Sequence, residues 1–233
     1  AHPHIRRAQR REHPQRTTRR HGLPTSLQTA VHEQINKIQT QEMNTPLDTT
    51  LVDKAIVFAT RAHQGTERRG KGFPYIVHPL EAMAIVATIT NAPDLLAAAV
   101  LHDTVEDTDV TLDDLKQEFG EHIANLVADE TDVKHTPDGK KLTWKERKQR
   151  DMDNLKAASR EVKIVAIGDK LSNMRAIARD YRQKGDALWQ IFRVKDKATH
   201  AWRYKGLRDA LQELKDTFAF QEFDQLVEEI FGE

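Results

Sequence analysis

The stretch LLAAAVLHDTVEDTDVT, residues 95–111, decides how the rest of the chain is interpreted. An apolar, alanine-rich segment ends in His102-Asp103, and Glu106-Asp107 follow one helical turn later. Because residues four apart share a helix face, we expect His102 above Glu106 and the two aspartates above one another. Ionisable groups attached to a buried segment are costly unless they have partners, and a metal ion would be one. The alternative is an ordinary helix end followed by a solvated acidic turn.

Composition limits the classes of protein that fit. The chain has 233 residues, 38% hydrophobic and 31% charged, which is typical of a soluble, helix-rich protein with one main core. No apolar run is long enough to cross a bilayer, so we expect no membrane association. The chain has no cysteine, which fits a cytoplasmic location and excludes thiolate metal sites. Any metal would be held by His, Asp and Glu, which suits Mn, Mg, Fe or Zn.

The N-terminal segment differs from the rest in charge. Residues 1–20 contain seven arginines and one acid, Glu12, and so carry +6, whereas the whole chain is neutral. With so few apolar residues, the arm 1–42 is expected to be disordered apart from a short helix from Ser26. It is interpreted as a passive tail, and the alternative is binding of nucleic acid through its arginines. Residues 43–233 form the expected globular domain.

Helical periodicity dominates that domain, and no strand pattern or internal repeat interrupts it. Thr111 with Asp114, and Thr143 with Glu146, have the spacing of capping boxes, and Gly120 is a stop signal. The sequence therefore predicts an all-α fold of about eight to ten helices. The expected helices are 51–63, 80–90, 94–102, 112–120, 122–132, 144–159, 161–182, 186–203 and 206–231.

A cationic loop, QGTERRGKGFPYIVHPL, spans residues 64–80. Its glycines and prolines end the preceding helix, and Arg68, Arg69 and Lys71 come before His78. The proline after His78 suits the first turn of a helix, so the histidine is expected at a helix start. This arrangement suits an anionic ligand held beside a metal. A solvated basic loop with a packed histidine is the alternative.

A second acidic group lies in the segment EVKIVAIGDKLSNMRAIARDYR, residues 161–182. Asp169 follows a run of apolar residues, and Asn173 shares its helix face. A carboxylate in such surroundings needs a partner, either a metal or a buried cation such as Arg175.

Three motifs together resemble a known family. The order of His78, His102-Asp103 and Asp169 is similar to the HD-domain metallophosphohydrolases. The segments RAHQGTERRGKGFPYIVHPLEA, AAAVLHDTVEDTDVT and KIVAIGDKLSNMRAI more closely resemble the hydrolase domain of RelA/SpoT-type enzymes and the single-domain small alarmone hydrolases. The resemblance covers residues 51 to about 205.

The resemblance implies an HD-domain helical bundle that hydrolyses the 3′-pyrophosphate of guanosine tetraphosphate (ppGpp) or pentaphosphate (pppGpp), giving GDP or GTP and pyrophosphate, with one Mn²⁺ per chain. It assigns catalytic roles to Glu106 and Asp107. His63 is expected to be a packed histidine, not a ligand. The implied metal ligands are His78, His102, Asp103 and Asp169, and the implied substrate contacts are Arg69, Lys71, Tyr75 and Asn173.

The chain also departs from the family pattern. The usual Arg-Lys pair is replaced by Arg69-Gly70-Lys71, which alters the expected phosphate clamp. Ser172 and Ala176 replace His and Thr, and we expect both near the base and sugar, so the preference for guanine is uncertain. From the length of the sequence we expect no nucleotide-synthesising domain beside the hydrolase domain.

Two other functions remain alternatives. One is an HD phosphohydrolase acting on another nucleotide, such as the adenine alarmone ppApp or a dNTP. The other is a catalytically silent module that binds a nucleotide or nucleic acid. The expected partner is a small-molecule nucleotide, and a homo-oligomer is left open.

Overall fold

The computed structural model describes Thr29 and residues 47–132, 134–136 and 138–232. The chain divides into two units, residues 1–47 and 48–233. The expected arm, its short helix and the expected boundary at residue 43 lie outside the described residues, apart from Thr29. The fold below is that of the second unit.

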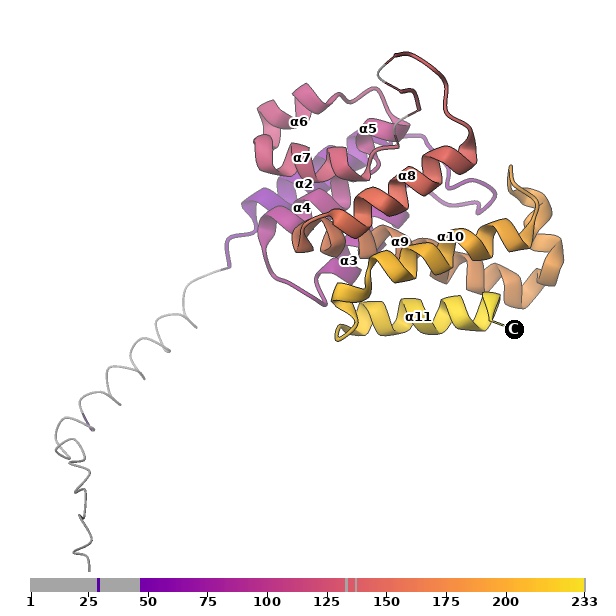
Figure 1. Cartoon of the computed structure of the whole chain (residues 1–233). Coiled ribbons are helices and arrows are strands. Elements are labelled where there is room, and N and C mark those ends of the chain that lie inside the picture. The colour runs from indigo at the N-terminus through magenta and orange to yellow at the C-terminus, as the bar shows by residue number, and fades with distance from the viewer. Residues whose placement is uncertain (1–28, 30–46, 133, 137, 233) are drawn as a thin grey trace, which may run out of the picture. The chain divides into compact units, whose positions relative to one another are not determined.

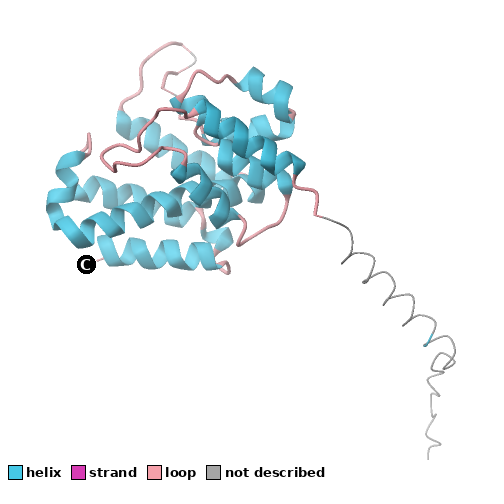
Figure 2. Cartoon of the chain, turned by 180° about the vertical axis from the view of Figure 1, so that it is seen from behind, coloured by secondary structure: helices cyan, strands magenta, loops and turns pink. Residues whose placement is uncertain are grey.

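This unit is built from helices joined by loops (Figures 1 and 2), which confirms the all-α prediction. Within the described ranges there is no strand, only two isolated bridges. None of the described helices has the length and apolar character needed to span a bilayer. The elements are α2 (Thr50–Ala62), α3 (Val77–Val86), α4 (Pro93–Leu101), α5 (Thr104–Asp107), α6 (Leu112–Phe119), α7 (Glu121–Glu130), α8 (Trp144–Ala157), α9 (Arg160–Lys184), the 3₁₀ helix η1 (Gly185–Ile191), α10 (Lys197–Ala210), the 3₁₀ helix η2 (Gln212–Leu214) and α11 (Phe218–Phe231).

Helix α4 lies at the centre of the N-terminal half. It packs against α2, α3, α7 and α9, and the run from Ala97 to Leu101 has no exposed surface. Small alanine side chains allow several helices to approach α4 closely, and the buried apolar area holds it in place. The residues that follow it, His102 and Asp103, therefore leave the core at a fixed point.

Helix α9 connects the two halves, because it packs against α3, α4 and α7 on one side and α11 on the other. It approaches α3 closely at Gly168. A Cβ atom there would lie 2.7 Å from the carbonyl oxygen of Ala82 and 2.9 Å from Val86 Cγ2. The absence of a side chain thus brings α3 and α9 together one residue before Asp169.

The two capping boxes are present, at Thr111 with Asp114 and at Thr143 with Glu146. The expected helices 186–203 and 206–231 are wrong in their boundaries. The first region is a 3₁₀ helix, then a loop, then α10, whose start is capped by Asp196. The second is broken before α11, which is capped by Thr217. In each case the capping side chain accepts a hydrogen bond from the backbone N–H three residues later. This bond stabilises the start of a new helix at that point.

Candidate metal centre and adjoining cavity

Three helices deliver the predicted histidine and aspartate ligands to one place. His78 is the second residue of α3, His102 directly follows α4, and Asp169 lies in α9. Ligand atoms of these three residues all lie within 4.8 Å of one another, so the group could hold a metal ion. Asp169 Oδ1 is 3.1 Å from His78 Nε2 and 3.6 Å from His102 Nε2.

The protein fixes which imidazole nitrogen faces the centre. Nδ1 of His102 lies 2.8 Å from the carbonyl oxygen of Ala99, which can only accept, so Nδ1 carries the proton. Nδ1 of His78 lies 2.8 Å from Ser172 Oγ, whose own proton is donated to Glu81. Nε2 of each imidazole therefore faces the centre, and its lone pair is the one available to a metal ion. Backbone and hydroxyl partners of this kind orient the histidine ligands of metal sites.

Asp103 lies against the same two nitrogens, with Oδ2 3.0 Å from His102 Nε2 and 3.4 Å from His78 Nε2. Nε2 of His102 is buried and has no hydrogen-bond partner among the described residues. A nitrogen lone pair this close to a carboxylate needs a positive charge between them, either a proton or a metal ion. The donor set of two imidazoles and two carboxylates fits a divalent ion of the Mn or Zn type.

The charges of these groups are mutually stabilised. Burial alone would lower the pKa of His102, but Asp103 and Asp169 raise it well above its usual value. Burial would raise the pKa of Asp103, but His102 and His78 hold it well below. Both carboxylates thus remain negative, as metal ligation requires.

Lys170 supports the centre from behind. Its ammonium lies 2.8 Å from Asp169 Oδ2 and 2.9 Å from Glu130 Oε2, and all three side chains are largely buried. Burial opposes ionisation of Asp169, but Lys170 and the two histidines keep its pKa well below the usual value. Since Oδ2 is occupied by Lys170, Oδ1 remains as the oxygen that faces the imidazoles.

Glu106 and Asp107 lie in α5, beside the centre. Helix α4 ends at Leu101 and α5 begins at Thr104, so the residues from His102 to Asp107 do not form one continuous helix. The hydroxyl of Tyr75 lies 2.6 Å from Asp103 Oδ2 and 2.8 Å from Asp107 Oδ2, so the two aspartates do share a face.

The environment of Glu106 raises its pKa. Burial raises the pKa of Glu106, Asp103 raises it further, and Lys148 acts in the opposite direction. Its carboxylate accepts a long hydrogen bond of 3.4 Å from the backbone of Asp132. Asp132 in turn pairs with Arg147 and Lys148 at the start of α8. A carboxylate with a raised pKa beside a metal centre has the properties of a proton-transfer group.

A cavity of about 210 Å³ lies behind Glu130, and a larger one of about 540 Å³ opens beside the centre. All four predicted substrate contacts line the larger cavity. Its wall is formed in part by the loop after α2, the start of α8, and the segments η1 and α10. Its lining residues are Arg68, Arg69, Gly70, Lys71, Tyr75, Trp144, Asn173, Ala176, Ile177, Asp180, Lys184, Ile191, Phe192, Arg193, Val194, His200, Arg203 and Tyr204.

The predicted contacts differ in how free they are. Lys71 forms an ion pair with Asp180, so its charge is already compensated. Arg69 is exposed at the edge of the cavity. Asn173 donates to Asp169 Oδ1 and accepts from Arg68 Nη2 at 2.6 Å, which links the centre to the cavity. Arg68 also lies over the ring of Tyr75, at 5.2 Å from its centroid.

The expectation for Ser172 was wrong. Its side chain is buried between His78 and Glu81 and does not line the cavity. It supports the imidazole of His78, whereas Ala176 lines the cavity. Conversely, Trp144 and Arg203 line the cavity and were not singled out from the sequence. Only the meeting of α8 and α10 brings them there, and neither carries a recognisable motif.

His63 is packed, as expected, and is not part of the three-residue metal group. Its ring lies 4.8 Å from that of Tyr75, and neither ring nitrogen has a hydrogen-bond partner among the described residues. Burial lowers its pKa. A neutral ring at this position supports Tyr75 through packing.

The fold and the centre define an all-α protein with a His and Asp metal site of the HD type. The chain belongs to the HD-domain family, which it matches over residues 55–196. It is 35% identical over 167 residues to the guanosine-3′,5′-bis(diphosphate) 3′-pyrophosphohydrolases of Mus musculus and of Homo sapiens, with 70% of this chain and 88% of each relative covered. It is also 34% identical over 152 residues to the GTP pyrophosphokinase rsh of Brucella ovis, covering 63% of this chain and 19% of that protein.

Solved structures agree with this assignment. The structure of a metazoan SpoT orthologue described as hydrolysing ppGpp matches 79% of this chain and 98% of that chain, with a TM-score of 0.65 and 22% identity, and so shares the fold. A Listeria monocytogenes EGD-e protein matches 69% of this chain and 99% of that chain, with a TM-score of 0.60 and 28% identity.

Proposed function

We propose that this protein hydrolyses the 3′-pyrophosphate of ppGpp and pppGpp, releasing GDP or GTP and pyrophosphate, with one Mn²⁺ per chain held by His78, His102, Asp103 and Asp169. The reaction would take place in the cytoplasm. The support from relatives is the 35% identity to two enzymes named for this activity, of which the chain covers 88%.

The observation that carries the proposal is the position of the metal centre at the edge of a cation-rich cavity. Two imidazole nitrogens and the carboxylate of Asp169 converge, and Asp103 lies against the same two nitrogens. Asn173 and Tyr75 belong both to the surroundings of this centre and to the cavity wall. A phosphorylated nucleotide in the cavity can therefore bring a phosphate group to the centre. A silent binding module would not need ligand lone pairs held in this orientation.

A divalent ion in this set supplies neutralisation of phosphate charge and a lower pKa for water at the site. The residues around it have separate tasks. Glu106, with its raised pKa, would accept a proton from the attacking water and return it to the leaving ribose oxygen. Asp107 would orient that water. Tyr75, whose hydroxyl lies against one carboxylate oxygen of Asp103 and one of Asp107, would keep both side chains in position.

At the cavity side, Arg68 and Asn173 would hold the ribose and the inner phosphate of the substrate, with Arg69 nearer solvent. Arginine can grip phosphate through two parallel hydrogen bonds. Lys71 would act through Asp180, by fixing the loop against α9, more than by direct contact with phosphate.

The deciding experiment is a substrate panel with the full chain loaded with Mn²⁺. We expect ppGpp and pppGpp to be converted to GDP and GTP with release of pyrophosphate, while GTP, dGTP and ATP remain intact because they carry no 3′-pyrophosphate. Products are identified by ion-exchange chromatography and phosphorus NMR. Release of phosphate from ordinary nucleotides with ppGpp unchanged would contradict the proposal.

One observation favours testing a second substrate, ppApp. Ala176 lines the cavity and offers no side-chain hydrogen bond to a base. Including ppApp in the panel measures how strongly the cavity distinguishes adenine from guanine.

A further inference from the structure

The charges that line the larger cavity are unbalanced. Six lining side chains are cationic and one, Asp180, is acidic. Asp180 compensates Lys71, and burial lowers the pKa of His200, which is therefore neutral. The remaining cations come from two places in the chain: Arg68 and Arg69 from the loop before α3, and Lys184, Arg193 and Arg203 from the end of α9 and the segments that follow it. A ligand with a single anionic group, bound at the metal centre, would leave the charges of the second set uncompensated.

Arg203 is the most enclosed member of that second set. Its Nε is buried and has no hydrogen-bond partner, and no carboxylate lies within 4.0 Å of its guanidinium among the described residues. Lys184 and Arg193 are exposed and can be compensated by solvent. Arg203 as a whole is half-buried, but its buried Nε–H donor costs free energy without a partner unless a ligand supplies the acceptor.

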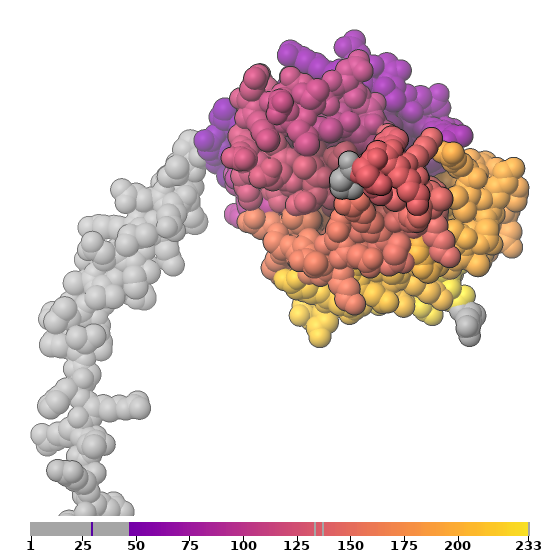
Figure 3. All heavy atoms as spheres, turned by 45° about the horizontal axis from the view of Figure 1, so that its top comes forward, coloured from indigo at the N-terminus to yellow at the C-terminus, as the bar shows by residue number. Residues whose placement is uncertain are grey.

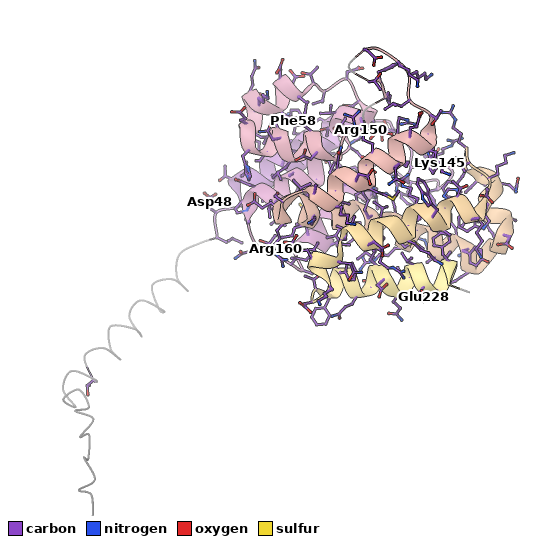
Figure 4. The ribbon with its side chains drawn as sticks, in the orientation of Figure 1. Asp48, Phe58, Lys145, Arg150, Arg160 and Glu228 are labelled. Atoms are coloured by element: carbon purple, nitrogen blue, oxygen red, sulfur yellow. The ribbon has the colours of Figure 1, made fainter. Side chains whose placement is uncertain are left out.

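The guanidinium of Arg203 is also held in position. It lies over the ring of Trp144 in α8, 5.9 Å from the centroid. The neighbouring residues make the opposite contact, in which Lys145 of α8 lies over the ring of Trp202 in α10, at 5.5 Å. Figure 4 labels Lys145 near the end of α8 that lies beside α10, and these two helices are in contact. On the face seen in Figure 3, the red region that includes the start of α8 lies next to the orange region that follows α9. Arg203 is thus fixed by aromatic packing rather than by an ion pair.

We propose that Arg203 binds the 5′-phosphates of the substrate and makes the enzyme selective for 3′-pyrophosphorylated nucleotides that also carry a 5′-diphosphate or 5′-triphosphate. This inference rests on the proposed function. The substrate has two phosphate groups on either side of the ribose, and the cavity has two sets of cations on separate segments. The 3′ group belongs at the metal centre, so the 5′ group is the anion available to Arg203.

The surroundings of Tyr204 place both sets near one point. Burial raises the pKa of its hydroxyl, and the positive charges of Arg203 and Arg68 both act to lower it. Asp169 raises this pKa and Lys170 lowers it as well, so the charges of the metal centre also reach Tyr204. Arg68, Arg203 and Tyr204 all line the same cavity. A compact polyphosphate between the two guanidinium groups would neutralise both, whereas the uncharged edge of a base would neutralise neither.

The test measures kcat/KM for a series of guanosine 3′-pyrophosphates that differ only at the 5′ position: triphosphate, diphosphate, monophosphate and hydroxyl. For the wild-type enzyme we expect kcat/KM to be at least ~10-fold higher with the 5′-diphosphate than with the 5′-hydroxyl, the usual effect of a charge-assisted hydrogen bond. In Arg203→Gln this ratio should approach one, because the 5′-diphosphate compound loses the contact that the 5′-hydroxyl compound never makes. Arg203→Lys, which keeps the charge but not the planar fork, should retain part of the ratio.

The control variant is Arg182→Gln, because Arg182 is exposed, lies outside the cavity and pairs with Glu229 on α11. It should behave as wild type with every substrate. Dissociation constants of ppGpp and of the 5′-hydroxyl compound, measured by calorimetry in EDTA, give a second readout without turnover. We expect Arg203→Gln to weaken binding of ppGpp alone.

Other outcomes overturn the inference. An equal loss on all four compounds would make Arg203 structural, and an unchanged ratio would remove it from the 5′ subsite. A change confined to the ratio between ppGpp and ppApp would make it a reader of the base. If the wild-type enzyme cleaves none of the 3′-pyrophosphates, the proposed function itself fails, which is a different result from activity without 5′ selectivity.

Discussion

The metal centre and the cavity beside it are built in different ways. The side chains of His78 and His102 are 3% exposed, and both are fixed by hydrogen bonds to the protein before any ligand arrives. In the cavity, Arg69 and Arg193 are exposed to solvent, whereas Lys71 is held by an ion pair with Asp180. A rigid, buried centre suits chemistry that is the same for every substrate, and an adaptable cationic wall suits selection among substrates.

The largest expected effect separates the two regions completely. Asp103→Ala removes a carboxylate that lies beside both imidazoles, so we expect loss of the metal ion and of all detectable turnover. Nucleotide binding in EDTA should be retained, because the cations of the cavity are untouched. Metal content is measured by mass spectrometry, and wild-type protein should gain thermal stability on addition of Mn²⁺ while the variant should not. Full activity in Asp103→Ala would show that the centre is not catalytic.

A smaller effect separates metal binding from proton transfer. Glu106→Gln should lower kcat by at least ~100-fold, the common contribution of a general acid or base, and leave metal content unchanged. Loss of the metal in this variant would instead make Glu106 a ligand.

The same variant has a predicted pH signature. Since the pKa of Glu106 is raised in the folded protein, the folded state binds more protons than the unfolded state between the two pKa values. The free energy of unfolding therefore falls as pH rises through this range, and the cost is fully present above the folded pKa. Glu106→Gln removes this cost, so its gain in melting temperature over wild type should be larger at pH 7 than at about pH 4, near the unfolded value. An equal difference at both pH values would contradict this account.

The contrast between the two regions also explains what could be predicted from the sequence. His78, His102 and Asp169 follow local signals, namely a Pro at a helix start, the end of an apolar run and helical spacing, and the structure brings them together. The pairing of Lys71 with Asp180 depends on a contact between segments more than 100 residues apart. The position of Arg203 in the cavity wall depends on how α8 and α10 pack against each other. No local pattern encodes such contacts. The missed helix starts at Asp196 and Thr217 are a different case. Asp and Thr are common N-cap residues, so these two starts could have been predicted from the sequence.

The smallest of these predicted effects tests how far the centre is supported from behind, at the position where this chain carries Ser172. Ser172 accepts from Nδ1 of His78 and donates to Glu81, and it does not line the cavity. Ser172→Ala leaves Nδ1 without its partner, which weakens the orientation and basicity of the imidazole, so metal affinity should fall by ~10- to 100-fold. Saturating Mn²⁺ should restore kcat, and KM for ppGpp should stay within about twofold, because no cavity residue changes. Ala176→Ser is the matched control on the cavity side: it should leave metal affinity unchanged while it alters the ratio of kcat/KM between ppGpp and ppApp. If Ser172→Ala shifts that ratio and keeps its metal, the residue acts on the nucleotide after all, and the boundary drawn between the two regions is misplaced.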